Sequence, residues 1–278
     1  MTSTSARLGG RVGVRPGWQV ATLVDAWAES PSARTLVLDV PGWPGHAPGQ
    51  HVDLRLTAPD GYTAERSYSI ASAASPGTAS SVGPETVPDA GPTRVELTVQ
   101  RVPGGEVSTY LADAFAVGDT IEVRGPVGGW FVWHPTGTTG PLDPAPVLLL
   151  AGGSGVVPLT AMIRARRAAG SRVPFRLLYS VRRPEDRLYT RELGVPHPGD
   201  DGVDVTVLYT RSAPLDARRE PGRMTPADLA AWGWPAELGP ACFVCGPTGF
   251  VEAAATMLLA LGHEPARIKT ERFGPAGD

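Results

Sequence analysis

The pattern of apolar residues changes near Pro146, and this change restricts the chain to few architectures. Before Pro146, runs such as His51–Leu56 and Val95–Gln100 alternate apolar and polar residues. Such alternation is typical of strands with one buried face. After Pro146, Val147–Ala151 is a continuous apolar run, as expected for a strand covered on both faces of a parallel sheet. We therefore expect an antiparallel β domain followed by an α/β domain.

The first domain is expected over residues 16–140, after a flexible tail at residues 1–15. Short strands separated by Pro and Gly turns favour a barrel or a sandwich. One helix is predicted from Ser108, a potential N-cap, to Phe115. The Ser-, Pro- and Gly-rich stretch 73–92 is predicted to be a long exposed loop. The predicted strands are Gln19–Val24, Thr35–Val40, His51–Leu56, Val95–Gln100 and Thr120–Arg124.

The second domain is expected over residues 141–278, with a Pro-, Thr- and Gly-rich linker at 134–146 between the domains. Strand-like and helix-like segments alternate here, which predicts a parallel α/β sheet. The predicted strands after Val147–Ala151 are Phe175–Val181, Val203–Tyr209, Ala241–Cys245 and Ile268–Phe273. The predicted helices cover residues 158–169, 189–193, 225–232 with Thr225 as cap, and 249–261.

The composition excludes several classes of protein. The chain has 278 residues, 42% of them hydrophobic, and a net charge of −3, so a core can form and no clustered basic surface for nucleic acid is expected. The longest apolar run is too short to cross a bilayer, and the N-terminus lacks the pattern of a signal peptide. We therefore expect a cytoplasmic protein without a membrane segment.

The two cysteines, Cys242 and Cys245, lie on one predicted strand. Residues three positions apart on a strand point to opposite faces, so we expect no disulfide between them. Cys242 is expected to be a small buried apolar residue. Two thiolates are also too few for an iron–sulfur cluster, which normally has four.

The stretch Arg66-Ser67-Tyr68-Ser69 combines a cation, an aromatic ring and two hydroxyls. The planar guanidinium of Arg66 suits a phosphate, and the Tyr68 ring can lie against a flat heterocycle. On a strand these two side chains share one face. A flavin nucleotide, with a phosphate and a planar ring system, would meet both. The four residues alone fit an exposed strand with solvated side chains equally well.

A glycine-rich loop, Gly152-Gly153-Ser154-Gly155, connects the apolar run to the next helix. Free N–H groups at a helix N-terminus favour a phosphate, and glycines let the backbone approach it. Pro158, near the first helical turn, loses no donor that the helix needs. The loop differs from the G-x-G-x-x-G pattern of Rossmann dehydrogenases. A tight turn without a ligand is the alternative.

Five sequence blocks occur in an order and at spacings that resemble the ferredoxin–NADP reductase superfamily. They are Arg66–Ser69, Gly104–Leu111, Gly152–Pro158, Cys245–Pro247 and Glu271–Phe273. The resemblance extends from about Trp18 to Gly274, nearly the whole chain. It implies a two-domain fold, with an N-terminal antiparallel β-barrel that binds FAD and a C-terminal parallel-sheet α/β domain that binds the nicotinamide nucleotide. We expect no fused plant-type ferredoxin domain, because its cysteines are missing.

The resemblance implies the residues of the FAD site. Arg66 would hold the flavin phosphate, and Tyr68 would pack on the isoalloxazine ring. Ser69 would sit near the reactive nitrogen of that ring, with Ser67 beside it in the same site. Main-chain N–H groups would cradle the pyrophosphate at Gly105, Val107 and Ser108. Without the resemblance these last residues indicate only an ordinary capped helix, and FMN in place of FAD stays open.

The resemblance also implies a nicotinamide nucleotide site. Its residues would be Gly152, Gly153, Ser154, Gly155, Pro158, Cys245, Gly246 and Pro247. Cys245 would lie beside the nicotinamide during hydride transfer. Glu271 would be a proton or charge partner near the flavin, and Phe273 would cover the flavin ring. For Glu271 and Phe273, ordinary surface and core roles are the alternatives.

The choice between NADPH and NADH is expected to be made after the second strand of the α/β domain. Hydroxyl and guanidinium groups there suit an adenosine 2′-phosphate, whereas NAD sites tend to carry an acid. The residues concerned are Ser180, Arg182 and Arg183, with Arg187 and Arg211 nearby. Glu185 and Asp186 follow closely, so NADPH is favoured and NADH stays possible.

The sequence thus predicts an FAD-dependent NAD(P)H oxidoreductase. Hydride would pass from the nicotinamide to FAD, and electrons would then pass to a separate ferredoxin or oxygenase-type partner. One alternative is a free-standing flavin or ferric reductase without a protein partner. Another is a non-catalytic, flavin-binding subunit with an electron-transfer or regulatory role.

Overall fold

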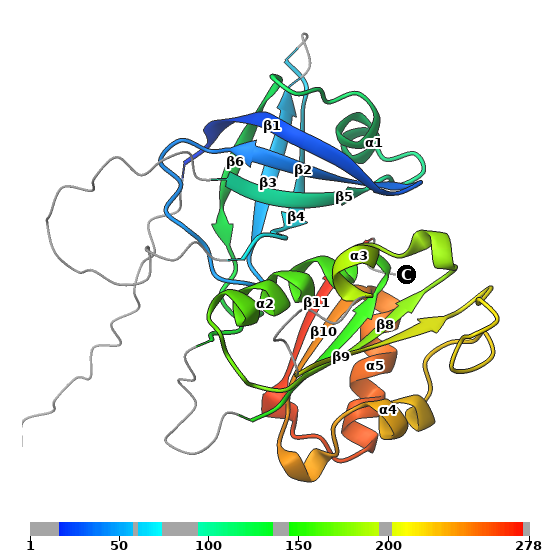
Figure 1. The fold of residues 1–278 in the computed structure, drawn as a ribbon. Helices are drawn as coiled ribbons and strands as arrows, with labels where there is room; N and C mark the ends of the chain where they lie inside the picture. Colours follow the sequence, from blue (N-terminus) through cyan, green and yellow to red (C-terminus); the bar gives the residue numbers. More distant parts are fainter. Residues whose placement is uncertain (1–16, 58–60, 74–93, 136–144, 195–201, 275–278) are drawn as a thin grey trace, which may run out of the picture.

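The computed structural model describes residues 17–57, 61–73, 94–135, 145–194 and 202–274. In Figure 1 an antiparallel sheet lies above a parallel sheet that is flanked by helices. This arrangement is the predicted fold class. The predictions for the tail at 1–15, for nearly all of the loop 73–92 and for the boundary between 140 and 141 lie outside the described residues.

The N-terminal sheet has six antiparallel strands in the order β4-β3-β6-β1-β2-β5. An isolated bridge between Ile70 and Leu97 joins the region after β4 to β5, so the two edges of the sheet meet as in the predicted barrel. Both residues are fully buried in the barrel core. The strands are β1 (Gln19–Ser30), β2 (Ala33–Asp39), β3 (His51–Thr57), β4 (Thr63–Ser69), β5 (Arg94–Gln100) and β6 (Thr120–Val127).

The helix α1 (Glu106–Asp113) of this domain begins earlier than predicted. Its N-cap is Gly105, so the prediction that Ser108 caps the helix is wrong. Ser108 lies inside the first turns, where its hydroxyl accepts a hydrogen bond from the Val102 amide at 3.1 Å. The positive φ of Gly104 (73°) turns the chain into the helix ahead of Ser108. Ser108 therefore braces the preceding turn.

The C-terminal sheet has five parallel strands in the order β11-β10-β7-β8-β9. Every residue of β7 (Val147–Gly152) is buried, as the continuous apolar run predicted. The other strands are β8 (Phe175–Val181), β9 (Val203–Tyr209), β10 (Ala241–Pro247) and β11 (Ile268–Phe273).

Helices cover both faces of this sheet (Figure 1). One face packs against α2 (Val156–Ala168) and α3 (Thr190–Leu193). The other packs against α4 (Pro226–Trp232) and α5 (Thr248–Ala260). Thr225 caps α4 as predicted, in a capping box with Asp228.

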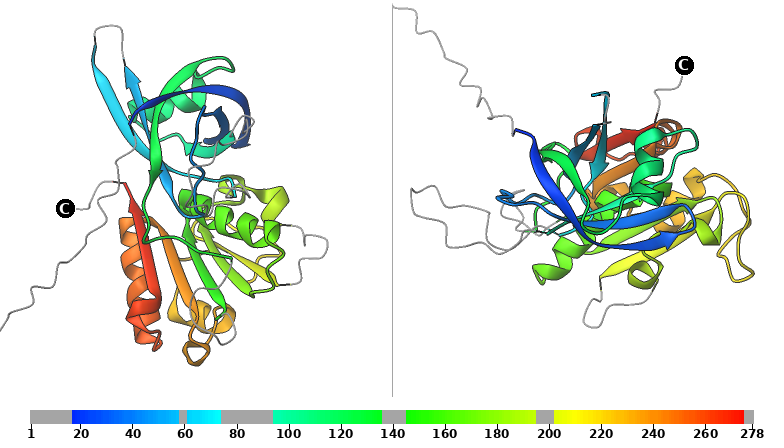
Figure 2. Two further views of the ribbon diagram at one scale, coloured as in Figure 1. Left: turned by 90° about the vertical axis from the view of Figure 1, so that its left-hand side faces the viewer. Right: turned by 90° about the horizontal axis from the view of Figure 1, so that it is seen from above.

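The barrel lies over the carboxyl ends of the parallel strands (Figure 2). Neighbouring strands are in register there: Cys245 is opposite Ala151 on one side and Glu271 on the other. In an open α/β sheet, ligands bind beyond the carboxyl ends of the strands, where the strand order reverses. Here that point lies between β7 and β10, and it faces the barrel.

Candidate functional site

Arg66 and Tyr68 lie on one face of β4, opposite Leu54 and Val52 of β3. Tyr68 is half-buried and packs against the barrel core, whereas Arg66 is exposed. Burial raises the pKa of Tyr68 to about 12, so its hydroxyl keeps its proton near neutral pH. The guanidinium of Arg66 donates to the adjacent Glu65 carbonyl at 2.6 Å, which leaves most of its donors to face outward. The ring and the cation thus stand side by side, as a flavin nucleotide requires.

Ser67 points to the other face of the strand. Its hydroxyl donates to Asp53 Oδ1 at 2.6 Å, and Arg124 Nη2 donates to Asp53 Oδ2 at 2.8 Å. Partial burial alone would raise the pKa of Asp53, but the hydrogen bonds from Ser67 and Arg124 lower it below its ordinary value. The Ser67 hydroxyl therefore links β4 to β3, on the face away from Arg66 and Tyr68.

The start of α1 fits the diphosphate of FAD. The N-cap residue of α1 is Gly105, and among the described residues no side chain accepts a capping hydrogen bond from the first turn. The first N–H groups of a helix have no partner within the helix. A Cβ on Gly105 would lie 2.6 Å from Ser108 Oγ, so the tight turn needs glycine. The Val107 side chain, in the first turn of α1, is buried in the barrel core. α1 contacts β4, the strand that carries Arg66.

The glycines at the end of β7 divide into two groups. A Cβ on Gly155 would lie 2.1 Å from the Cys245 carbonyl oxygen, and one on Gly152 would lie 2.7 Å from the Phe250 ring. A Cβ on Gly246 would meet the same ring at 2.8 Å. These three glycines therefore allow β7, β10 and α5 to pack closely.

Gly153 belongs to the other group, because no described atom lies within 4 Å of the position its Cβ would take. Its φ of 55° places it in the left-handed region, and Ser154 beside it is half-buried. α2 follows at Val156, and Pro158 is buried in its first turn. Gly153 and Ser154, in the turn before α2, thus leave room for a nucleotide phosphate beside their N–H groups.

A row of polar side chains crosses between the two domains. The Cys245 thiol lies 3.7 Å from Glu271 Oε2, and Glu271 Oε1 lies 3.7 Å from His51 Nδ1 of the barrel. His51 is opposite Ser69 in the pairing of β3 with β4. Burial, together with the nearby Glu271 carboxylate, raises the pKa of Cys245 well above its ordinary value. Cys245 is therefore a neutral thiol at one end of this row.

His51 was not among the predicted site residues. Its strand was predicted, but its position beside Ser69 and Glu271 depends on strand register and on how the domains meet. The structure thus brings the predicted Ser69, Cys245 and Glu271 into one region and adds His51 to them. Phe273 ends β11 opposite Pro247, with 38% of its surface exposed.

The residues predicted to select the nucleotide lie at the end of β8. Ser180 is buried opposite Gly152, whereas Arg182 and Arg183 are exposed. Arg183 lies 3.8 Å from the Glu185 carboxylate, and the Arg211 amide donates to the Arg182 carbonyl at 3.0 Å. The loops after β8 and β9 are thereby joined, with exposed guanidinium groups beside the strand ends.

The cysteines, potential metal ligands and helix hydropathy complete the description of the chain. Both cysteines are free and buried. In the described parts of the chain, no group of His, Cys, Asp and Glu residues is arranged to hold a metal ion. No helix within those same parts is long and apolar enough to cross a membrane.

Two family models match the chain, one in each domain. Residues 84–132 match the oxidoreductase FAD-binding domain, and residues 149–256 match the oxidoreductase NAD-binding domain. The two matched regions contain the start of α1 and the glycine-rich loop after β7, respectively.

Curated relatives and solved structures agree with these matches. The chain is 31% identical over 231 residues to the glycine betaine monooxygenase reductase subunit of Pseudomonas aeruginosa. The aligned region covers 82% of this chain and 56% of that protein. It is 36% identical over 166 residues to ferredoxin–NADP reductase B of Sorangium cellulosum, covering 60% and 58%. The chain thus spans somewhat more than half the length of these relatives.

Among solved structures, the Amycolatopsis cytochrome P450 reductase superposes with a TM-score of 0.78 at 26% identity, covering 98% of this chain and 74% of that one. The order of the two matched domains, the relatives and the shared architecture lead to one assignment. The chain belongs to the ferredoxin–NADP reductase superfamily, with an FAD-binding barrel followed by an NAD-binding α/β domain.

Proposed function

We propose that the chain is an FAD-dependent NAD(P)H oxidoreductase that passes electrons to a separate ferredoxin or oxygenase-type partner. The observation that carries the proposal is the row of Ser69, His51, Glu271 and Cys245, which joins the flavin strand to the ends of the parallel strands. The names of two matched proteins, a monooxygenase reductase subunit and a cytochrome P450 reductase, support a role of this kind.

The chain's own residues would bind and orient the two nucleotides. Arg66 and the start of α1 would hold the FAD diphosphate, and Tyr68 would pack on the flavin ring. When bound, FAD takes up two electrons from the nicotinamide nucleotide and releases them to the acceptor. Cys245 would pack beside the nicotinamide as a small neutral thiol, because its raised pKa keeps it uncharged. Glu271 would be a proton or charge partner near the flavin, with His51 beside it.

Three further assignments belong to this proposal. NADPH is the preferred nucleotide, supported by the exposed Arg182 and Arg183 beside the strand ends. The domains divide near residue 140, as the change of pattern along the sequence suggests. The protein works in the cytoplasm, where reduced nicotinamide nucleotides are available.

The test uses the full chain purified and loaded with FAD. We expect a yellow protein whose visible absorbance is bleached anaerobically by NADPH and more slowly by NADH. A protein that cannot retain FAD would refute the proposal. A protein that binds FAD but is not bleached by either nucleotide would support a non-catalytic subunit instead.

The acceptor is tested separately. With NADPH as donor, turnover of a ferredoxin is compared with turnover of free flavin and of a ferric chelate. Faster turnover of the ferredoxin supports a reductase with a protein partner. Faster turnover of free flavin or ferric chelate would identify a free-standing reductase.

A further inference from the structure

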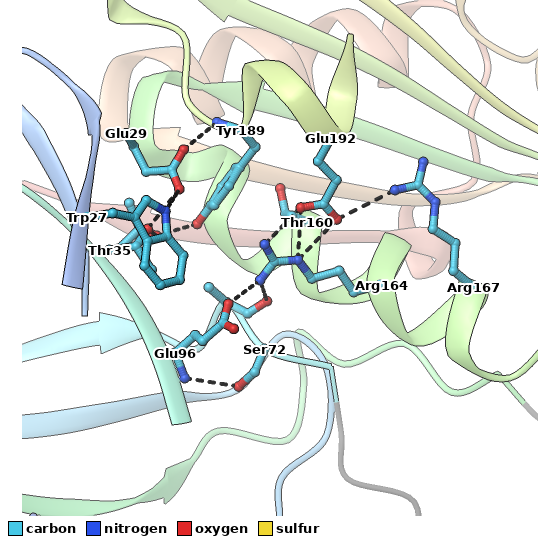
Figure 3. A network of polar contacts seen from close by, with 12 residues as sticks. Trp27, Glu29, Thr35, Ser72, Glu96, Thr160, Arg164, Arg167, Tyr189 and Glu192 are labelled. Atoms are coloured by element: carbon cyan, nitrogen blue, oxygen red, sulfur yellow. Dashed lines mark hydrogen bonds and ion pairs between the residues drawn. The ribbon is translucent and has the colours of Figure 1, made fainter. Parts of the chain in front are cut away.

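The two domains share a second polar contact, apart from the row of Ser69, His51, Glu271 and Cys245 (Figure 3). Its centre is formed by Arg164 of α2 and by Tyr189, which directly precedes α3. Both belong to the α/β domain, and both donate hydrogen bonds to the barrel. Neither residue touches the glycine-rich loop or Cys245 through a described hydrogen bond.

Arg164 uses its guanidinium to join three segments. Nε and Nη2 donate to the Glu192 carboxylate of α3, at 3.0 and 2.8 Å. Nη1 donates across the domain boundary to Glu96 Oε2 at 2.6 Å and to the Ala71 carbonyl at 3.0 Å. Ala71 follows Ser69 by two residues, so Arg164 holds the backbone that leaves the flavin strand.

Tyr189 contacts the barrel through both its backbone and its side chain. Its φ of 54° lies in the left-handed region, which non-glycine residues rarely adopt, and its N–H group donates to Glu29 Oε2 of β1 at 3.1 Å. Its hydroxyl donates to Thr98 Oγ1 of β5 at 2.5 Å. The Arg164 guanidinium lies 5.3 Å from the centre of the Tyr189 ring.

The hydrogen bonds of Tyr189 form a closed ring in which both arms start at Tyr189 and end at the Glu29 carboxylate. Tyr189 donates to Thr98, whose hydroxyl lies 2.7 Å from that of Thr35, and Thr35 donates to Glu29 Oε1 at 3.1 Å. Since the Thr35 hydrogen is used on Glu29, Thr98 must be the donor to Thr35. This series of hydrogen bonds therefore starts at the Tyr189 hydroxyl and ends at the Glu29 carboxylate, which also accepts a hydrogen bond from the Tyr189 amide. Burial raises the pKa of Tyr189, which keeps its hydroxyl a donor.

This contact is attached to both parts of the proposed nucleotide site. Arg164 lies on the helix that follows the glycine-rich loop, and Tyr189 follows the arginine-bearing loop after β8. On the barrel side it holds Ala71, next to the flavin strand. A shift of the α/β domain against the barrel would have to break the Arg164 contacts and the ring of Tyr189 together.

We propose that Arg164 and Tyr189 are positioning residues that fix the distance and angle between the nicotinamide and the flavin. The inference rests on the proposed function, because only that function gives the relative placement of the domains a kinetic consequence. Transfer between two bound rings is sensitive to misplacement by about 1 Å, which can slow a reaction about 100-fold. The contact thus acts on the rate of flavin reduction and not on nucleotide affinity.

The test compares Tyr189→Phe, Thr98→Val and the double variant with the unaltered FAD-loaded chain. The rate of flavin reduction at saturating NADPH is measured anaerobically, together with the dissociation constants of NADPH and FAD. We expect each single variant to slow flavin reduction about tenfold, with both dissociation constants unchanged. Flavin reduction in the double variant should be no slower than in the single variants, because both substitutions break the same series of hydrogen bonds. The long-wavelength absorbance of the stacked nicotinamide–flavin pair should weaken in parallel.

Thr160→Val is the matched control. Thr160 is fully buried on the same helix as Arg164, and its hydroxyl donates to the Val156 carbonyl within that helix. This variant should lose thermal stability and keep the normal rate of flavin reduction. Flavin reduction at the normal rate in Tyr189→Phe and Thr98→Val, or equal slowing in Thr160→Val, would overturn the inference. If neither nucleotide reduces the flavin bound to the unaltered protein, the proposed function itself would be refuted.

Discussion

The two domains contribute different groups to the site: mainly side chains from the barrel, and closely packed backbone from the α/β domain. On the barrel side, functional groups stand on side chains that reach outward, such as exposed Arg66 and half-buried Tyr68. On the α/β side, part of the site is backbone in close contact, because Gly155 packs directly against the Cys245 carbonyl. The barrel half can therefore lose Arg66 and keep its fold, whereas Gly155 in the α/β half cannot gain a side chain without moving the strands.

This difference separates binding from architecture. An exposed side chain contributes to affinity one hydrogen bond at a time, and its removal leaves the surrounding packing intact. A glycine with a backbone oxygen 2.1 Å from where its Cβ would be has no such freedom. Variants in the two halves should accordingly differ in what they damage, and four experiments test this.

The largest effect is expected from Gly155→Ala. The added methyl would collide with the Cys245 carbonyl, and overpacking of this kind costs about 1–3 kcal/mol of unfolding free energy. Bleaching of bound FAD by NADPH should be lost, because β7 and β10 are forced apart. Urea unfolding and anaerobic bleaching measure the two effects. Gly249→Ala is the control, since no described atom lies within 4 Å of its Cβ position; normal bleaching in Gly155→Ala would contradict this picture of the α/β half.

Arg66→Ala should affect binding alone. Loss of a hydrogen bond to a charged group, worth about 1.5–3 kcal/mol, should weaken FAD binding about 10-fold to about 100-fold. The melting temperature of the FAD-free protein should stay the same, because Arg66 is exposed. Fluorescence titration with FAD measures the affinity. The exposed Arg94→Ala in the same domain should bind FAD normally, and an equal loss in both variants would argue against a phosphate contact at Arg66.

Arg182→Glu tests whether the α/β half also carries side chains that act like those of the barrel. We expect the KM for NADPH to rise about tenfold, equivalent to about 1.4 kcal/mol, with little change in the KM for NADH. Steady-state kinetics with both nucleotides give the ratio. Arg191→Glu is the control: it makes the same charge change at an exposed residue of α3, outside the arginine pair Arg182 and Arg183. Equal effects on the two nucleotides would rule out recognition of the 2′-phosphate at Arg182.

The smallest effect is expected from Asp53→Asn on the supporting face of the barrel. The hydrogen bonds from Ser67 and Arg124 lower the pKa of Asp53 in the folded state. Its stabilisation, under about 1 kcal/mol, is thus present above the unfolded pKa of about 3.9 and is lost as the pH falls through the lower folded value. The melting temperatures of the two proteins should differ at pH 6 and converge in acid. The exposed Asp216→Asn is the control; a difference that grows in acid would contradict the assignment.

The strands and the cofactor motifs were predictable because their signals are local. The apolar run of β7 and the Thr225 cap of α4 each depend on residues a few positions apart, and both were confirmed. β1 continues to Ser30, beyond the predicted Val24, because its second half is half-buried or exposed and lacks an apolar pattern. Ser108 was misplaced because a serine near a helix start can brace the preceding turn as readily as cap the helix.

The contacts between the domains were beyond such reasoning. His51 reaches Glu271, and Arg164 reaches Glu96, only after both domains have folded and met. Nothing within the neighbouring residues distinguishes Arg164 from the other arginines of α2. Tyr189 was predicted as the first residue of a helix, and its left-handed conformation is supported by the Glu29 carboxylate from the other domain. The roles of the individual site residues stay predictions that the experiments above address.

The pairing of β7 with β10 has a consequence for the order in which the molecule forms. Ala151 and Cys245 are neighbours in the sheet but far apart along the chain, and contacts of such high sequence separation are slow to form in folding. A ligand that binds a structure absent from the folding transition state slows unfolding and leaves the folding rate unchanged. Nicotinamide nucleotide should therefore prolong the lifetime of the folded protein without hastening its refolding.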